Sequence, residues 1–543
     1  MKKFKYIISS LITVASLISC NNYLDVNENP NAIHAENITP ELLFPGAVSN
    51  AYRVQAGDMM QFGNLMMNSW AGDVYHYGGL YPNEFSLSAV NSQFYDGIWD
   101  GIYLNVNNFV AIENYPNTDH RQDKYIAMAK VMKAFYMQYI VDLYGDAPFR
   151  DAFKGQNNLA PKYDNDVDIY KTLITNLDEA VALITLNDPD AIAPAGKDIV
   201  FAGDMNKWKS FAYTLKLRFL LRMSNVTGDL ANYRNTQLAS LSAAVGTSGS
   251  GFISGDVLEN PGYSTSTNDK MNPFFLGYFY NSAGNEVQNH IVITASENLA
   301  IALNGNIGGN TTAEYQKFNG LTDPRRFRLF TSVTYNGVPQ VKGVRQGATS
   351  GQPGAPTDNQ NVSKLAVGNV VGSTAVGSIA QLLAVGGTRS GVIMSLAEAK
   401  FLLAEASLRY PSLFTSGQAA FNAGVLASGV WVGANSASMN TYITQTATRP
   451  GLGWVGTDAQ KLEAIMTQKW IALTNVNPTE MYVEYNRTDL PYNPVAVSAV
   501  KTRRPYRLVY PNSEYATNSA NVPNISSDVV FTKNQYTPFW NQN

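Results

Sequence analysis

Long stretches with helical periodicity constrain the fold of this chain more than any other feature of its sequence. Residues 124–143 contain no glycine, and the stretch ends at Gly145 with Pro148 beyond it, which is typical of a helix end. Apolar side chains also recur at steps of three and four within residues 168–184, 208–219 and 460–474. Each such stripe must be buried against another element. The pattern therefore predicts a mainly α-helical fold.

Small side chains within these stripes indicate how the helices pack. Ala129 and Ala134 lie in one stripe and Ala399 and Ala406 in another, so close helical pairs of the tetratricopeptide type are expected. No clean repeat of about 34 residues accompanies them. The helix with Ala399 should begin with a capping box, in which the Ser395 and Glu398 side chains satisfy free N–H groups.

The composition changes between the helical blocks. Residues 240–390 are rich in Gly, Ser, Thr and Asn, which indicates loops that serve a function or lack order. Residues 491–543 are also loop-like. We expect one domain over residues 20–543, in which helical pairs pack against a loop-rich half with a few short strands.

The first twenty residues predict export and lipidation. A basic start, residues 1–5, precedes an uncharged run that is shorter than the about 20 apolar residues of a membrane-spanning helix. The run ends in Leu17-Ile18-Ser19-Cys20, which fits a bacterial lipobox, and Cys20 is the only cysteine. We expect residues 1–19 to be a lipoprotein signal peptide, Cys20 to carry the lipid, and residues 20–40 to be a tether.

Charge and motif content exclude several classes of function. With 39 basic and 42 acidic residues, the chain has no basic footprint for nucleic acid. It has only four histidines and none of the common nucleotide, serine-hydrolase or zinc motifs, so no metal, cofactor or enzymatic activity is expected. Alternating oxygen groups over residues 164–168 could bind calcium, but helix N-capping explains them better. The basic residues among positions 207–222 are expected to form a solvated helix face.

Residues 68–81 are the candidate ligand site. They combine large aromatics with glycines and hydrogen-bonding groups, and their periodicity is neither helical nor strand-like. A loop that exposes such rings is a common recognition surface, whereas the alternative is that the rings tuck into the core. Residues 273–280 are a weaker candidate that resembles core. The candidate ligand-binding residues are Trp70, Asp73, Tyr75, Tyr77 and Tyr81.

Several segments, taken in order, resemble the SusD/RagB family of outer-membrane nutrient-binding lipoproteins. They span nearly all of the mature chain except residues 240–390, where Asp323-Pro324-Arg325 is similar to one branch of the family. The remaining segments are residues 141–149, 161–170, 177–180, 204–218, 397–406, 468–473, 484–488 and 503–511.

The resemblance implies about eight helices in four tetratricopeptide-like pairs beside an irregular half. It also implies a lipid-anchored, surface-exposed protein that captures a nutrient oligomer and delivers it to a SusC-like TonB-dependent transporter. A glycan is the expected ligand, and its rings would stack on aromatics edged by Asn and Asp. Peptide binding and a lipid-anchored hydrolase remain alternatives, and residues 345–390 are candidate transporter contacts.

Overall fold

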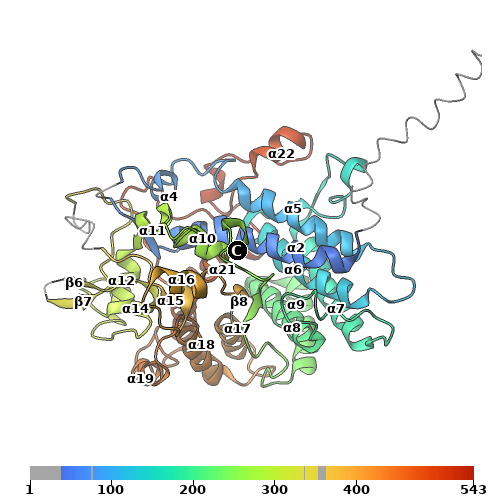
Figure 1. The fold of residues 1–543 in the computed structure, drawn as a ribbon. Coiled ribbons are helices and arrows are strands. Elements are labelled where there is room, and N and C mark those ends of the chain that lie inside the picture. Colours follow the sequence, from blue (N-terminus) through green and yellow to red (C-terminus); the bar gives the residue numbers. More distant parts are fainter. Residues whose placement is uncertain (1–37, 75–76, 336, 353–361, 543) are drawn as a thin grey trace, which may run out of the picture.

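The computed structural model consists mainly of helices, and most of the long helices pack against a helix that is near them in the chain (Figure 1). α5 lies between α2 and α6, α7 lies between α6 and α8, and α17 packs on both α18 and α20. This arrangement confirms the expected mainly helical fold with tetratricopeptide-like pairs. The long helices are α2 (Pro40–Val54), α5 (Asp96–Glu113), α6 (Asp123–Tyr144), α7 (Asp166–Leu186), α8 (Met205–Arg222), α9 (Gly228–Val245), α17 (Leu396–Arg409), α18 (Gly417–Val432), α19 (Ser436–Thr446), α20 (Asp458–Leu473) and α21 (Pro478–Thr488).

Capping residues fix where several of these helices begin. Asn165 begins α7 by accepting a hydrogen bond from the Val167 N–H at 3.2 Å, so the expected N-capping role of residues 164–168 is confirmed. Ser395 caps α17 by accepting from the Glu398 N–H at 3.1 Å. The Glu398 carboxylate does not complete the expected capping box, because it accepts a hydrogen bond from Arg218 at 3.1 Å instead. Thr457 and Gln460 form a full capping box at α20.

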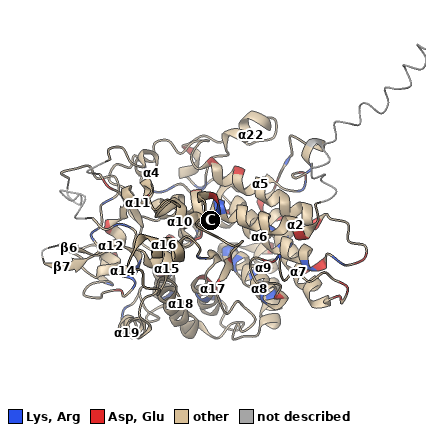
Figure 2. Ribbon diagram, viewed as in Figure 1, with Lys and Arg blue, Asp and Glu red and all other residues tan. Residues whose placement is uncertain are grey.

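The expectation that the basic residues of α8 form a solvated face was wrong for three of the five. Lys207 is exposed and Lys209 partly exposed, but Lys216, Arg218 and Arg222 are buried. Arg222 donates to Asp142 at 3.2 Å, to Glu480 at 2.7 Å and to Glu484. These partners lie on α6 and α21, and Figure 2 shows charged positions on helices in the middle of the molecule as well as at its periphery. The buried pairs therefore join helices that are distant in the sequence.

Short elements and loops occupy the left side of Figure 1. The short helices there are α10 (Pro273–Tyr278), α11 (Gln288–Val292), α12 (Glu297–Asn304), α13 (Ala313–Gln316), α14 (Arg326–Leu329), α15 (Gly368–Val371) and α16 (Ile379–Gly386). Together with the connecting loops, they form the expected loop-rich half. Phe274, Phe275, Tyr278 and Phe279 of the 273–280 segment are buried, which confirms that this segment is core.

Among the residues that the structure describes, the strands form four antiparallel pairs, with two to four residues in each strand. They are β1 (Trp70–Gly72) with β5 (Ile293–Ala295), β2 (Ala147–Pro148) with β3 (Tyr163–Asp164), β4 (Val257–Glu259) with β8 (Gly391–Met394), and β6 (Val333–Tyr335) with β7 (Val338–Gln340). The β1–β5 pair joins the segment after α3 (Met60–Met66) to the loop-rich half, and β5 is followed directly by α12.

The structure describes residues 38–74, 77–335, 337–352 and 362–542. Cys20, the signal peptide and most of the expected tether therefore lie outside the described residues. Within the described part of the chain, no helix combines the length and the apolar character that a bilayer crossing requires.

Candidate functional site

Trp70, the most prominent aromatic of the sequence-predicted site, lies in the core. It is in β1, its side chain is fully buried, and its ring packs against Tyr278 with the ring centroids 5.1 Å apart. The indole Nε1–H donates to the Asn475 Oδ1 at 2.7 Å. The interpretation of this segment as an exposed loop was therefore wrong for Trp70, and its alternative as local core describes the residue.

The other predicted residues of this segment differ in their surroundings. Asp73 is buried and pairs with Lys364, whose Nζ lies 3.1 Å from its Oδ2. Tyr75 lies outside the described residues. Tyr77 and Tyr81 are partly exposed, and burial of the Tyr81 hydroxyl raises its pKa. Of the described candidates, only Tyr77 and Tyr81 are placed where they could reach a ligand, and their role stays a prediction.

The segment around Trp70 supports the base of a long groove. Asn68 lines the groove, and its Nδ2 donates to the Pro494 carbonyl at 3.0 Å. The Trp70 carbonyl accepts a hydrogen bond from Gln346 at 2.6 Å. Since β1 pairs with β5 and β5 leads into α12, this buried segment positions one wall of the groove.

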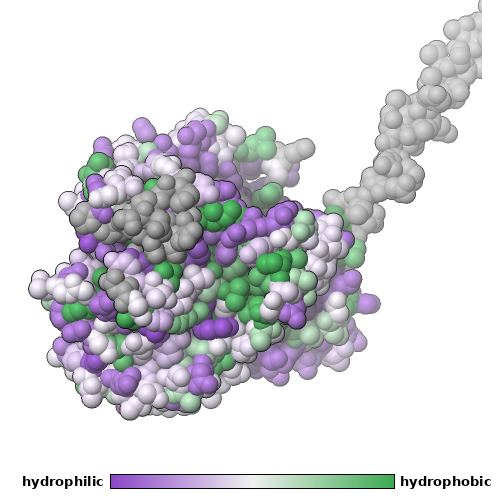
Figure 3. Space-filling model, turned by 60° about the vertical axis from the view of Figure 1, so that its left-hand side comes forward, coloured by the Kyte–Doolittle hydropathy of each residue, from purple (hydrophilic) through white to green (hydrophobic). Residues whose placement is uncertain are grey.

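The groove consists of two adjoining hollows beside α12, and we call it the α12 groove. The larger hollow has about 1860 Å³ of empty volume and the smaller about 680 Å³. Glu297, Asn310 and Arg345 line both hollows, so one extended ligand could occupy the two. Figure 3 brings the loop-rich half forward and shows a mostly polar surface with scattered apolar patches.

Two tyrosines give the α12 groove its aromatic surface. Tyr335 lines the larger hollow with 41% of its area exposed, and Tyr492 lines the smaller with 37% exposed. Among the described residues, no other Phe, Trp or Tyr side chain is as exposed as these two. The Lys342 ammonium lies 4.2 Å from the Tyr335 ring centroid, and Tyr315 meets Tyr492 edge-on at 5.5 Å. Exposed tyrosine side chains combine an apolar ring face with a polar hydroxyl, which suits a recognition surface that stays in contact with water.

Polar and charged groups surround these rings. The amide side chains that line the groove are Asn68, Asn298, Asn304, Asn306, Asn310, Gln340 and Gln346. Glu297 accepts a hydrogen bond from the Arg345 Nε at 2.7 Å, and this bond raises the pKa of Arg345. Arg326 lies over the Phe327 ring at 4.2 Å, and partial burial lowers its pKa. Such groups can donate to and accept from the hydroxyls of a sugar chain.

Buried contacts hold the backbone of the groove in place. Ser296 caps α12 by accepting from the Leu299 N–H at 3.0 Å. Asn304, at the other end of α12, pairs with both backbone groups of Val341 at 2.7 and 3.0 Å. Arg504 is buried and donates to the carbonyls of Asn493 and Pro494 at 3.1 Å, which fixes the loop that carries Tyr492.

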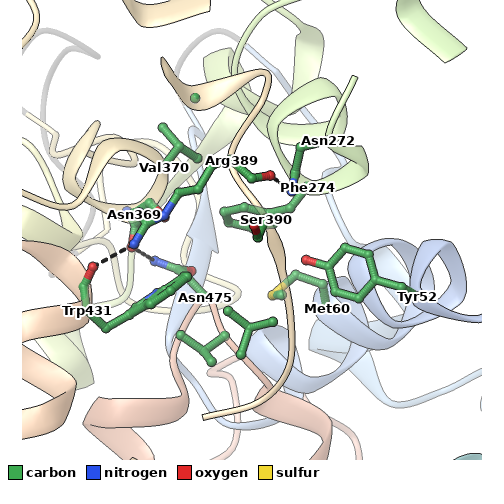
Figure 4. Close-up of a pocket in the computed structure, with 13 residues that line it drawn as sticks. Tyr52, Met60, Asn272, Phe274, Asn369, Val370, Arg389, Ser390, Trp431 and Asn475 are labelled. Carbon is green, nitrogen blue, oxygen red and sulfur yellow. Dashed lines mark hydrogen bonds between the residues drawn. The ribbon is translucent and has the colours of Figure 1, made fainter. Parts of the chain in front are cut away.

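Another hollow, with about 330 Å³ of empty volume, lies between the two halves and is shown in Figure 4. Arg389 stacks on Trp431 at 3.8 Å and donates to the Trp431 carbonyl at 2.8 Å, and burial lowers its pKa to about 10. Asn475 donates to the Asn369 Oδ1 at 3.1 Å, and Asn272 donates to the Arg389 carbonyl at 2.9 Å. Because these polar side chains are already bonded to one another or to backbone carbonyls, this hollow is a structural junction and the α12 groove is the better candidate site.

Sequence reasoning missed Tyr335 and Tyr492. Tyr335 ends the short strand β6 and Tyr492 lies in a loop far away in the chain, whereas Trp70 and its neighbours form a dense cluster in the sequence. One signal was available for Tyr335, because Asn-Gly at positions 336–337 is a common hairpin signal between short alternating strands. β6 and β7 pair there, and Gly337 has a φ of +74°.

Comparison with known proteins establishes the class of the molecule. A SusD-like family model, described as starch-binding associating with outer membrane, matches residues 30–263 and 287–511. Because these two segments make up most of the chain, the chain belongs to the SusD-like family. The resemblance seen in the sequence is thereby confirmed.

Several solved structures share the fold. A chitin-binding protein is 23% identical with a TM-score of 0.68, covering 93% of this chain and 100% of its own. A chitin-binding SusD homolog from Flavobacterium johnsoniae is 21% identical with a TM-score of 0.64, covering 92% and 98%. A SusD homolog from Bacteroides thetaiotaomicron is 20% identical with a TM-score of 0.64, covering 89% and 93%. No match was found among curated protein sequences.

Proposed function

We propose that this protein captures an oligosaccharide at the cell surface and delivers it to a SusC-like TonB-dependent transporter. The observation that carries the proposal is the placement of Tyr335 and Tyr492 in one groove lined with amides. Sugar rings pack their C–H faces on aromatic planes, while their hydroxyls form hydrogen bonds with amides and charged groups. The family description and the two chitin-binding structural neighbours support a glycan as ligand.

The protein acts in this proposal as a binding protein and not as an enzyme. It is held at the outer membrane by a lipid on Cys20, and the residues after Cys20 form the tether. The lipobox supports the anchor, and the family description supports the association with the outer membrane. A peptide ligand would depend more on backbone pairing and shallow apolar pockets than on stacking.

The proposal is tested by titrating a panel of oligosaccharides and peptides against aromatic variants. Tyr335→Ala and Tyr492→Ala should each weaken oligosaccharide binding by about 1–3 kcal/mol, by analogy with measured base–aromatic stacking. Tyr233→Ala is the matched control, because a lysine also lies over that ring, with the Lys171 Nζ at 5.4 Å, and Tyr233 is on α9 away from the groove. Peptide binding that survives both groove variants, without any oligosaccharide binding, would contradict the proposal.

The transporter partner is tested separately. The protein should co-purify with a large outer-membrane barrel from gently solubilised cells, and residues 345–390 are candidate contacts. Arg345 and Gln346 of this segment also line the groove, so the transporter and the ligand could meet there. A protein that migrates alone, under conditions that preserve another transporter complex, would count against this part of the proposal.

A further inference from the structure

The α12 groove carries more positive than negative charge, although the whole chain has a net charge of −3. Its charged lining consists of Arg326, Lys342, Arg345 and Glu297. Arg345 and Glu297 neutralise each other in an ion pair of 2.7 Å. Arg326 and Lys342 therefore supply the excess charge of the larger hollow.

Arg326 differs from the two arginines beside it. Arg325 is buried and makes an ion pair with Asp323 at 2.6 Å, and Arg328 donates to the carbonyls of Val432 and Gly372. Arg326 instead lines the groove, and no carboxylate of the described residues lies within ion-pair distance (4.0 Å) of it. Its guanidinium is thus available for a ligand group.

Lys342 is the second available cation. Its ammonium lies 4.2 Å from the centroid of Tyr335, and within the described part of the chain no carboxylate is in ion-pair contact with it. A sugar ring that stacks on Tyr335 would therefore lie close to a positive charge. An acidic substituent on that sugar could reach the ammonium without leaving the aromatic surface.

We propose that the ligand is an anionic glycan, whose carboxylate or sulfate groups are bound by Arg326 and Lys342 while a sugar ring stacks on Tyr335. This inference rests on the proposed function of the groove. A carboxylate and a sulfate offer the same chemistry to the protein, namely an anion with several acceptor oxygens that matches the planar guanidinium donors of arginine.

Desolvation favours an anionic ligand over a neutral one. A ligand that covers Arg326 removes water from a partly buried guanidinium, and this costs free energy unless an opposite charge replaces the water. Hydroxyls of a neutral sugar restore hydrogen bonds but no countercharge. Positive potential in a groove also raises the local concentration of anions, which offsets the repulsion expected from the net negative charge of the chain.

The test compares glycans that differ only in charge. Oligogalacturonate and its methyl-esterified form share one backbone, chondroitin sulfate and desulfated chondroitin test the sulfate, and chitin hexaose is the neutral reference. Binding to the full chain is measured by calorimetry in low and high salt, with Arg326→Gln, Lys342→Gln and Tyr335→Ala. Lys197→Gln removes an exposed positive charge from the loop before α8 and is the matched control.

The expected result is that a charged member of a pair binds more tightly than its neutral form and loses affinity as salt rises. Arg326→Gln and Lys342→Gln should each weaken that binding about five- to tenfold, since charge-assisted hydrogen bonds are the stronger ones. Lys197→Gln should leave it unchanged. If neutral glycans bind as tightly as charged ones, and the two charge variants have no effect while Tyr335→Ala does, the inference is overturned and the proposed function stands. If no glycan binds, the proposed function fails and the inference fails with it.

Discussion

Truncation of Trp70 separates a structural role for this residue from a ligand-binding one. Trp70→Ala removes a fully buried ring, and large core truncations of this kind cost about 3–5 kcal/mol. It also leaves the Asn475 Oδ1 without the indole donor at 2.7 Å, which adds about 1–3 kcal/mol. The sum is comparable with the total stability of many domains. Trp70→Phe is therefore the better variant, because it keeps a ring against Tyr278 and mainly removes the N–H donor, at a cost of about 1–3 kcal/mol.

Thermal unfolding of Trp70→Phe and of Tyr335→Ala gives the comparison. The Tm of Trp70→Phe should fall by several degrees while its affinity for an oligosaccharide changes little. Tyr335→Ala should do the opposite, because exposed substitutions usually change stability by about 0.5 kcal/mol or less. A normal Tm with reduced affinity in Trp70→Phe would refute the reasoning and restore Trp70 as a ligand-binding residue.

Three further predictions concern buried charge and the anchor. Burial raises the pKa of Glu259 to about 7. Because the folded state favours the protonated form of Glu259, the wild type loses stability as pH rises from about 4.5 to 7. In denaturant titrations, the free energy of unfolding of Glu259→Gln should therefore gain up to about 3 kcal/mol relative to the wild type between pH 5 and pH 8. The same difference in free energy of unfolding between variant and wild type at both pH values would contradict this. Arg222→Met removes the buried guanidinium that pairs with Asp142, Glu480 and Glu484 and should lower the free energy of unfolding by about 3–5 kcal/mol, whereas exposed Lys207→Met should not. Cys20→Ala should abolish metabolic labelling with palmitate, and a labelled, membrane-bound variant would refute lipidation at Cys20.

The helices could be predicted because their signals are local. The expected stretch 124–143 is α6 (Asp123–Tyr144), and the expected stretch 460–474 is α20 (Asp458–Leu473). The burial of Arg218 and Arg222 could not be predicted in the same way. Their carboxylate partners include Glu398 and Glu484, which are 180 and 262 residues away in the chain, so a basic stretch that pairs inside the core has the same local pattern as a solvated face.

The site was harder to predict than the fold. Aromatic residues cluster in the sequence around Trp70, and this clustering predicted a ligand site there. In the structure, Trp70 instead belongs to the core and supports the groove. Tyr335, in the β6–β7 hairpin, and Tyr492, in the loop after α21, line adjoining hollows beside α12 although they are far apart in the sequence. Proximity of this kind depends on the tertiary fold, and no spacing along the chain encodes it.

A structure of the protein with a bound oligosaccharide tests the central claim most directly. The account predicts sugar rings on Tyr335 and Tyr492, with the chain passing the Glu297–Arg345 pair that both hollows share. An oligosaccharide bound instead over Tyr77 and Tyr81, with the α12 groove empty, would contradict it.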